Sequence, residues 1–443
     1  MLRYWEVNRA VAFLVASRGW QFVSGFITLF LLTQYLPGEA IGVYSAFANQ
    51  LGVQLFAELG LPGIVVVLAS HEWAHLQLDP QRRIDGNAQC QMRLAGLLRF
   101  ADRWFWMAGV LFVLIAGGLG TWNLEHSDTG LVDWRWPWIC SVLSSALCFP
   151  YIPRIALLEG CNQVDRVNLL RLYQSIAGSL VVWLVLMSGA GLWALVGSNM
   201  VRWGCETWLV HVHYRATFQS LREVTVHEPM CWRKEIWPLQ WRFAIQSIGS
   251  YFSTYFFQPL ILRVQGGVVA GQFGMTWQVL NTLYTVSYSW VNTRMAELGI
   301  LASRGEHDLL HRRLRKIGWI SVGVFLIGSL CFSLTVEALR RVGIRMGSQF
   351  LPHQEAAVLV LGMTGILVAT LWQLRVRLYK HDPFLIPNTL AAISMAGLAW
   401  FGIQREGSWG LAVGYAGLVW VFTVPVSFWV MRNTIPAPAH RTD

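Results

Sequence analysis

Charged and amide side chains recur at helical spacing inside stretches that are otherwise apolar. Arg18 and Gln21 lie three positions apart in the first such stretch and therefore share one face of a helix. In the second stretch Gln50, Gln54 and Glu58 follow one another every four residues. Within a bilayer, a charged side chain costs about 2.5 kcal/mol or more unless it faces protein or water. Such a stripe either contacts a ligand in a polar cavity or hydrogen-bonds neighbouring helices.

The second half of the chain carries a similar polar set. Arg242 and Gln246 are four apart in one apolar stretch, and Asn281 lies in the next. Arg202 and Glu206, also four apart, can neutralise each other, which leaves the remaining balance cationic. Guanidinium groups pair with phosphate oxygens in a two-pronged geometry, so this set suits a phosphate-bearing ligand. The predicted ligand-contacting residues are Arg18, Gln21, Gln54, Glu58, Arg242, Gln246, Asn281 and Arg294.

Catalytic and metal-binding patterns are weak. His71, Glu72 and His75 give the HExxH spacing that binds zinc when it lies on one helix, but no third ligand accompanies it. The seven cysteines form no CxxC pair. No nucleotide-binding or serine-hydrolase motif occurs in a suitable setting. We predict no catalytic residue, no metal site and no cofactor, and hence a protein that is not an enzyme.

The composition indicates a membrane protein. Of 443 residues, 55% are hydrophobic and only 13% are charged. Soluble domains carry about 25% charged residues. The apolar runs are roughly 20 residues long, enough to cross a bilayer as helices. The net charge of +10 is scattered over short loops, which argues against nucleic acid as a partner. We therefore expect an all-α polytopic membrane protein.

The apolar runs predict about 12 transmembrane helices in two groups of six. Residues 1–211 form the predicted N-terminal lobe, 212–235 a cytoplasmic linker and 236–443 the C-terminal lobe. Lys and Arg are concentrated in alternate loops, which predicts that both termini are cytoplasmic. The predicted spans are 9–35, 42–70, 104–122, 137–158, 169–188, 191–211, 237–262, 268–290, 317–336, 356–372, 383–401 and 408–431.

An internal repeat relates the two halves. The segment LPGEAIGVYSAFANQL matches QGGVVAGQFGMTWQVL at an offset of about 230 residues. Six predicted spans separate the copies, so both halves would run in the same direction through the membrane. Parallel repeats of this kind are typical of secondary transporters, whose substrate sites lie between the repeats.

The first two spans resemble a known family. Arg18, the turn LPGEAIGVYSAF, the helix FAELGLPGIVVVLASHE and the two repeats are similar to polysaccharide flippases of the multidrug/oligosaccharidyl-lipid/polysaccharide exporter superfamily, above all translocases of O-antigen and other lipid-linked oligosaccharides. This resemblance implies two lobes around a V-shaped central cleft in a bacterial inner membrane. The implied substrate is a polyprenyl-diphosphate-linked oligosaccharide, moved from the cytoplasmic to the periplasmic leaflet by alternating access during surface polysaccharide biosynthesis.

The same resemblance implies membrane lipids as partners and H⁺ or Na⁺ as a coupling ion. It matches Arg18 and Arg242 to the cationic lumen residues of such flippases. The chain departs from the family in having little Lys in its spans. It also has no extended hydrophobic helices after the last span, unlike the lipid II flippases with fourteen spans.

Two other functions stay open at this stage. A drug or metabolite exporter of the same superfamily would bind cations in a more acidic cleft, with Glu58 dominant. A membrane-bound polysaccharide polymerase or acyltransferase would need a long exterior loop with reactive residues at the membrane edge. Only the segment from Arg340 to His353 approaches that description.

Overall fold

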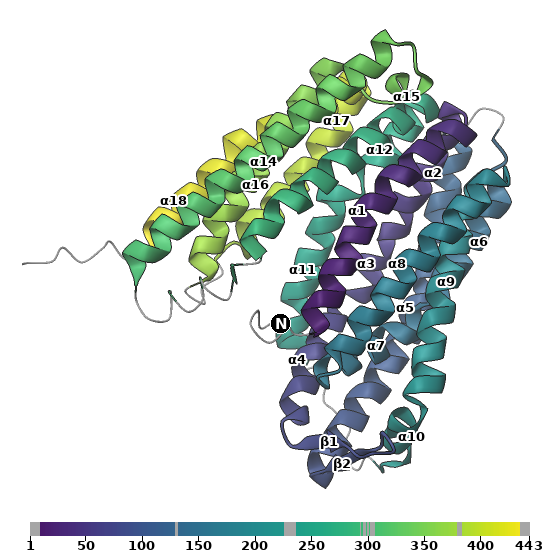
Figure 1. Cartoon of the computed structure of the whole chain (residues 1–443), viewed down its shortest axis with the longest axis vertical. Helices are drawn as coiled ribbons and strands as arrows, with labels where there is room; N and C mark the ends of the chain where they lie inside the picture. The colour runs from purple at the N-terminus through teal and green to yellow at the C-terminus, as the bar shows by residue number, and fades with distance from the viewer. Residues whose placement is uncertain are drawn as a thin grey trace, which may run out of the picture. The chain divides into compact units, whose positions relative to one another are not determined.

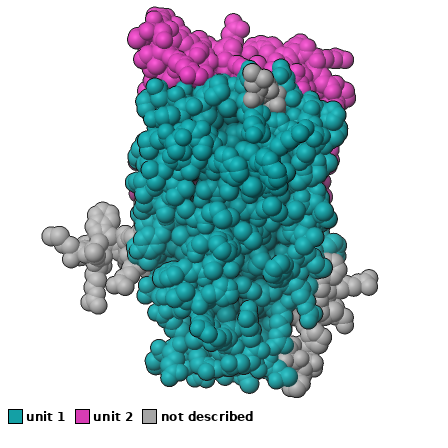
Figure 2. Space-filling view, turned by 90° about the vertical axis from the view of Figure 1, so that its right-hand side faces the viewer, with its two compact units in different colours: residues 1–251 teal, residues 252–443 magenta. Residues whose placement is uncertain are grey.

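The computed structural model of the chain is almost entirely helical (Figure 1). It describes residues 9–128, 132–225, 236–292, 294–295, 298, 301, 306–378 and 383–434. The chain forms two compact units, residues 1–251 and 252–443, coloured separately in Figure 2. The predicted linker lies partly outside the described residues, so the sequence-based lobe boundaries stay predictions.

The first unit contains the first six predicted spans. Its second and fourth spans are each assembled from several shorter helices, because Gly and Pro interrupt them. The elements are α1 (Arg9–Tyr35), α2 (Gly38–Gln50), a 3-10 turn (Leu51–Val53), α3 (Gln54–Glu58), α4 (Leu61–Trp73), β1 (Leu76–Leu78), β2 (Ile84–Gly86), α5 (Ala88–Glu125), α6 (Arg135–Ala146), a 3-10 turn (Phe149–Tyr151), α7 (Ile152–Gly160), α8 (Val164–Met187), a 3-10 turn (Gly191–Trp193), α9 (Ala194–Trp208), a π-helical turn (Leu209–His213), α10 (Arg215–Glu223) and α11 (Trp237–Thr254), whose last three residues belong to the second unit.

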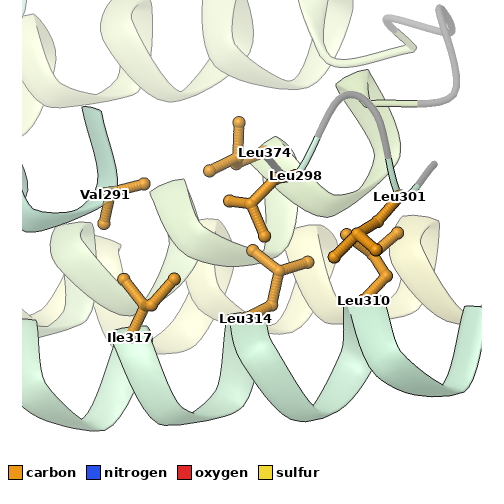
Figure 3. Close-up of a cluster of buried hydrophobic side chains, with 7 residues drawn as sticks. All are labelled: Val291, Leu298, Leu301, Leu310, Leu314, Ile317 and Leu374. Atoms are coloured by element: carbon orange, nitrogen blue, oxygen red, sulfur yellow. The ribbon is translucent and has the colours of Figure 1, made fainter. Parts of the chain in front are cut away.

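The second unit contains α12 (Phe257–Asn292), α14 (His307–Arg341), α15 (Arg345–Ser348), α16 (His353–Arg377), α17 (Leu385–Leu418), a π-helical turn (Val419–Thr423) and α18 (Val424–Thr434). Seven buried side chains form one core cluster (Figure 3). They come from the end of α12, the residues that follow it, α14 and α16. The cluster consists of Val291, Leu298, Leu301, Leu310, Leu314, Ile317 and Leu374.

Two of these long helices reverse direction at a glycine. Gly407 has φ of 66°, and a Cβ on Gly410 would lie 2.2 Å from the carbonyl oxygen of Gly402. Residues eight apart in a straight helix are separated by about 12 Å, so α17 is a hairpin of two helices. Gly266 turns α12 in the same way, with φ of 79°. The Gln265 side chain joins the two turns by accepting a hydrogen bond from the Ser408 N–H at 2.7 Å.

The membrane class predicted from composition is confirmed: the chain is an all-α polytopic membrane protein. Among the described residues, six helical segments are long and apolar enough to span a bilayer, or seven if the bent pair Gly38–Glu58 and Leu61–Trp73 counts as one span. One of the six, Leu385–Thr434, contains the Gly407 hairpin and therefore covers two predicted spans. The predicted spans outside these segments, the first, sixth, seventh and eighth, are also helical. They carry most of the predicted site residues.

Two sequence motifs outside the spans have structural roles. The helix α4 ends at Trp73, so His71 and His75 do not share one helix, and Glu72 forms an ion pair with Arg93 at 3.4 Å. In the described part of the chain no group of three metal-ligating side chains is close enough to hold an ion. Arg340, the first residue of the segment considered above as a reactive exterior loop, donates to the carbonyls of Gly347, Phe350 and Leu351 at 2.9–3.0 Å.

Candidate functional site

The second predicted span is broken in its middle. We expected one continuous helix over residues 42–70, and this was wrong. Leu59 and Gly60 both adopt left-handed backbone conformations, with φ of 44° and 69°. The helices on either side, α3 and α4, are bent by 47°. The physical cause is local, because Gly60 tolerates positive φ and Pro62 in the first turn of α4 has no N–H to continue the helix.

Neighbouring helices hold this break in place. A Cβ on Gly60 would lie 2.4 Å from the Cβ of Phe243, so α11 packs directly against the backbone there. The indole N–H of Trp104 on α5 donates to the carbonyl oxygen of Ala57 at 3.3 Å, one turn before the break. Half-helix ends inside a membrane leave backbone groups free for ligands and commonly mark transport sites. The break therefore points to a functional position.

Glu58 is the last residue of α3, directly before the break. The amide of Gln54 donates a short hydrogen bond to the Glu58 carboxylate, as their four-residue spacing predicts. Arg202 on α9 also attracts Glu58 electrostatically. The Glu58 carboxylate is thus partly compensated from two directions within the first unit.

Arg202, which is half-buried, belongs to a polar network around the buried Glu206. Its Nε–H donates to Glu206 Oε1 at 2.9 Å, which confirms the ion pair expected from their spacing. The amide of Gln174 on α8 donates to the same oxygen at 3.4 Å. Only 5% of Glu206 is exposed, and its second oxygen, Oε2, has no hydrogen-bond partner in the described part of the chain. A buried carboxylate oxygen of this kind is costly unless water or a ligand reaches it.

A cavity of about 340 Å³ adjoins this network. Its polar lining consists of Arg202, Glu206 and Gln174 together with Arg171 and Glu159, which pair with each other. Arg171, Gln174 and Glu159 are not among the residues predicted from the sequence to contact a ligand. A signal was present, because Arg171 and Gln174 lie three positions apart in an apolar stretch, as Arg18 and Gln21 do.

Arg18 and Gln21 lie together on the exposed side of α1. Arg18 Nη1 donates to Gln21 Oε1 at 3.2 Å, and Gln21 Nε2 donates to Ser175 Oγ on α8 at 3.0 Å. Next to them, the Trp20 indole N–H donates to Ser179 at 2.9 Å and anchors α1 on α8. No carboxylate pairs with Arg18 in the described residues. The predicted face shared by Arg18 and Gln21 is confirmed by their contact.

The remaining predicted residues lie on three segments. Arg242 and Gln246 are exposed on α11, and the Arg242 guanidinium lies 5.5 Å from the centre of the Trp241 ring. In the second unit, the Asn281 amide donates to the carbonyl of Trp277 on its own helix at 3.0 Å. Arg294 is exposed just after α12. The convergence of all eight residues on one cleft stays a prediction.

The chain matches no protein-family model and no curated protein by sequence. Solved structures do match its fold over nearly its whole length. An inward-facing multidrug resistance MATE family transporter of the MOP superfamily aligns with a TM-score of 0.63 and 11% identity, covering 93% of this chain and 94% of that one. The lipid II flippase MurJ in an inward closed conformation gives 0.65 and 10%, covering 95% and 87%.

A third structure, the MATE multidrug transporter DinF-BH, aligns with a TM-score of 0.62 and 11% identity, covering 96% of this chain and 95% of that one. The chain has the fold of these membrane transporters. At 10–11% identity the likeness concerns the fold. Substrate and mechanism have to be argued from the side chains.

Proposed function

We propose that this protein is a transporter that moves a polyprenyl-diphosphate-linked oligosaccharide from the cytoplasmic to the periplasmic leaflet of a bacterial inner membrane. Transport proceeds by alternating access of a cleft between the two lobes and supplies surface polysaccharide biosynthesis. Both termini are cytoplasmic, and H⁺ or Na⁺ serves as the coupling ion. The fold shared with transporters and flippases supports the general mechanism, and the charges described below support the substrate class.

One observation carries the substrate class. Arg18 and Arg242 are exposed, and neither forms an ion pair in the described part of the chain. Arg18 lies nine residues into α1, about 13 Å along the helix. A guanidinium held at that depth without a carboxylate requires water or an anionic ligand. A diphosphate supplies the two-pronged acceptor that such a group binds best.

The carboxylates at the break and at the adjoining cavity, Glu58, Glu206 and Glu159, are by contrast already compensated. Gln54 and Arg202 accompany Glu58, Arg202 binds Glu206, and Arg171 binds Glu159. A site for cationic drugs would require an acidic side chain that is open to the substrate. The charge arrangement therefore favours an anionic ligand over the cation expected for a drug exporter, and Glu58 is the residue that tests that alternative.

The proposal is tested by complementation in a bacterium that lacks its own oligosaccharide flippase. Wild-type protein should restore surface polysaccharide, whereas Arg18→Ala and Arg242→Ala should abolish it at unchanged protein levels in the membrane. Arg135→Ala is the matched control, because Arg135 is exposed in the same unit but pairs with Glu125 at 3.9 Å. Normal polysaccharide display in both test variants would contradict the assignment. Drug resistance that depends on Glu58 would instead support the exporter.

A further inference from the structure

A groove runs between α14 and α16 on the surface of the second unit, with a volume of about 450 Å³. Leu314 lines the groove and also belongs to the core cluster of Figure 3, which joins α14 to α16 through Leu314, Ile317 and Leu374. None of the residues that line the groove belongs to the predicted substrate set. The groove is therefore a separate feature of the fold.

Each helix contributes one continuous stripe to the groove. On α14 the stripe begins with His311 and Arg315 and continues through apolar residues to Val322. On α16 it begins with Val368 and ends at Arg375. The two helices run in opposite directions, so both stripes are basic at one end of the groove and apolar along the rest. The groove is thus amphipathic along its length.

The basic end is built to hold an anion. Arg375 Nη2 donates to His311 Nε2 at 2.5 Å, which fixes the orientation of the half-buried guanidinium. Arg315 is exposed, and no described residue forms a hydrogen bond or ion pair with it. Among the described residues that line the groove, none carries a carboxylate. The guanidinium groups of Arg315 and Arg375 therefore both line this end of the groove.

The apolar part is open and suited to a hydrocarbon chain. Trp319 is 72% exposed next to the basic end, as expected for an aromatic residue at headgroup depth. Gly318 keeps the floor of the groove low, because even a Cβ there would lie 3.3 Å from the Leu371 side chain. The floor then continues along Val322, Val368 and Leu371.

We propose that this groove is a binding site for an anionic glycerophospholipid of the surrounding bilayer. Arg315 and Arg375 hold the headgroup phosphate, and one acyl chain lies over Gly318 between the two helices. The charges match a phosphodiester, and the adjoining apolar floor matches the chain that a free phosphate or diphosphate lacks. Basic pockets between membrane helices bind acidic lipid headgroups in this manner. The proposal is independent of the transported substrate.

The test uses the full chain in lipid nanodiscs that contain phosphatidylcholine with a minority of phosphatidylglycerol and no polyprenyl lipid. Native mass spectrometry then counts the lipids that stay bound after ejection from the disc. Wild-type protein should retain phosphatidylglycerol in preference to phosphatidylcholine. Arg315→Gln should lower that preference about fivefold, the effect expected for one guanidinium near an anionic lipid. Arg315→Lys, which keeps the charge, should retain most of it.

Two matched variants separate the groove from charge alone. Arg313→Gln removes the same charge two residues away, on the opposite face of α14, and should leave the preference unchanged. Gly318→Leu keeps every charge but fills the groove, and should abolish retention. Equal retention of both lipids by wild type, equal loss in Arg315→Gln and Arg313→Gln, or full retention in Gly318→Leu would each overturn the proposal. If inorganic diphosphate displaces the lipid and also binds the Gly318→Leu variant, the groove is a site for free anions, and this result would also overturn the proposal.

Discussion

Replacing Gly60 by Ala tests whether the break in the second span is a built feature of the fold. Gly60 has φ of 69°, a conformation that costs an L-residue about 1–2 kcal/mol. The new Cβ would also lie 2.4 Å from the Cβ of Phe243, which is close to the backbone and cannot rotate away. Overpacking of this kind costs about 1–3 kcal/mol. We therefore expect Gly60→Ala to destabilise the protein by about 2–5 kcal/mol in total.

The thermal unfolding midpoint of the purified protein in detergent measures this effect. Gly63→Ala is the matched control, because Gly63 lies three residues further on in α4 and a Cβ there would meet no atom within 4 Å. The control should unfold at or slightly above the wild-type temperature, since Ala favours a helix over Gly by about 1 kcal/mol. Equal midpoints for Gly60→Ala and Gly63→Ala would refute the left-handed break and its close contact with α11.

Three further predictions concern polar groups away from the break. Arg202→Ala should destabilise the protein by about 3–5 kcal/mol, because it removes the ion-pair partner of the buried Glu206 carboxylate. The double variant with Glu206→Gln should recover part of this loss. The unfolding midpoint of each variant checks both expectations. Gln373→Leu should lower the free energy of unfolding by about 1–3 kcal/mol, because the side-chain amides of Gln373 and Asn388 donate hydrogen bonds to each other at 3.1 and 3.2 Å. A variant as stable as the wild type would contradict that pairing. Burial and, after it, nearby arginines lower the pKa of His213, which lies beyond the predicted sixth span, so the stabilising contribution of the neutral imidazole is present above pH ~6.5 and is lost as the pH falls. His213→Asn should therefore make the unfolding midpoint less sensitive to acid. An unchanged dependence of the midpoint on pH would contradict this.

The class of fold was accessible from the sequence because it depends on quantities that composition and run length determine. A long apolar run with few charges has to be a membrane helix, whichever neighbours it packs against. Local spacing was equally informative, and the contacts of Arg18 with Gln21 and of Arg202 with Glu206 both follow from helical periodicity. These predictions required no knowledge of how the helices are arranged.

The features that depend on several helices were not accessible. Gly60 and Pro62 carried a signal for the break, but an apolar run around them also suits a continuous helix, and the contact with Phe243 decides between the two. The hydrogen bond between Gln174 on α8 and Glu206 on α9 joins residues that are 32 positions apart in the sequence. Periodicity gives the face on which a side chain lies but not the helix that this face meets. The convergence of the predicted site residues is of this kind and stays a prediction.

The central claim is that the protein moves a lipid-linked diphosphate across the bilayer, and flipping in reconstituted liposomes tests it most directly. Purified protein is placed in vesicles with a polyprenyl-diphosphate-linked oligosaccharide, and the fraction of the sugar open to an external glycosidase is followed over time. Wild-type protein should expose the whole pool, whereas Arg18→Ala should leave the inner-leaflet fraction protected, as in protein-free vesicles. Protection that is the same with wild-type protein as without protein would contradict the proposed function.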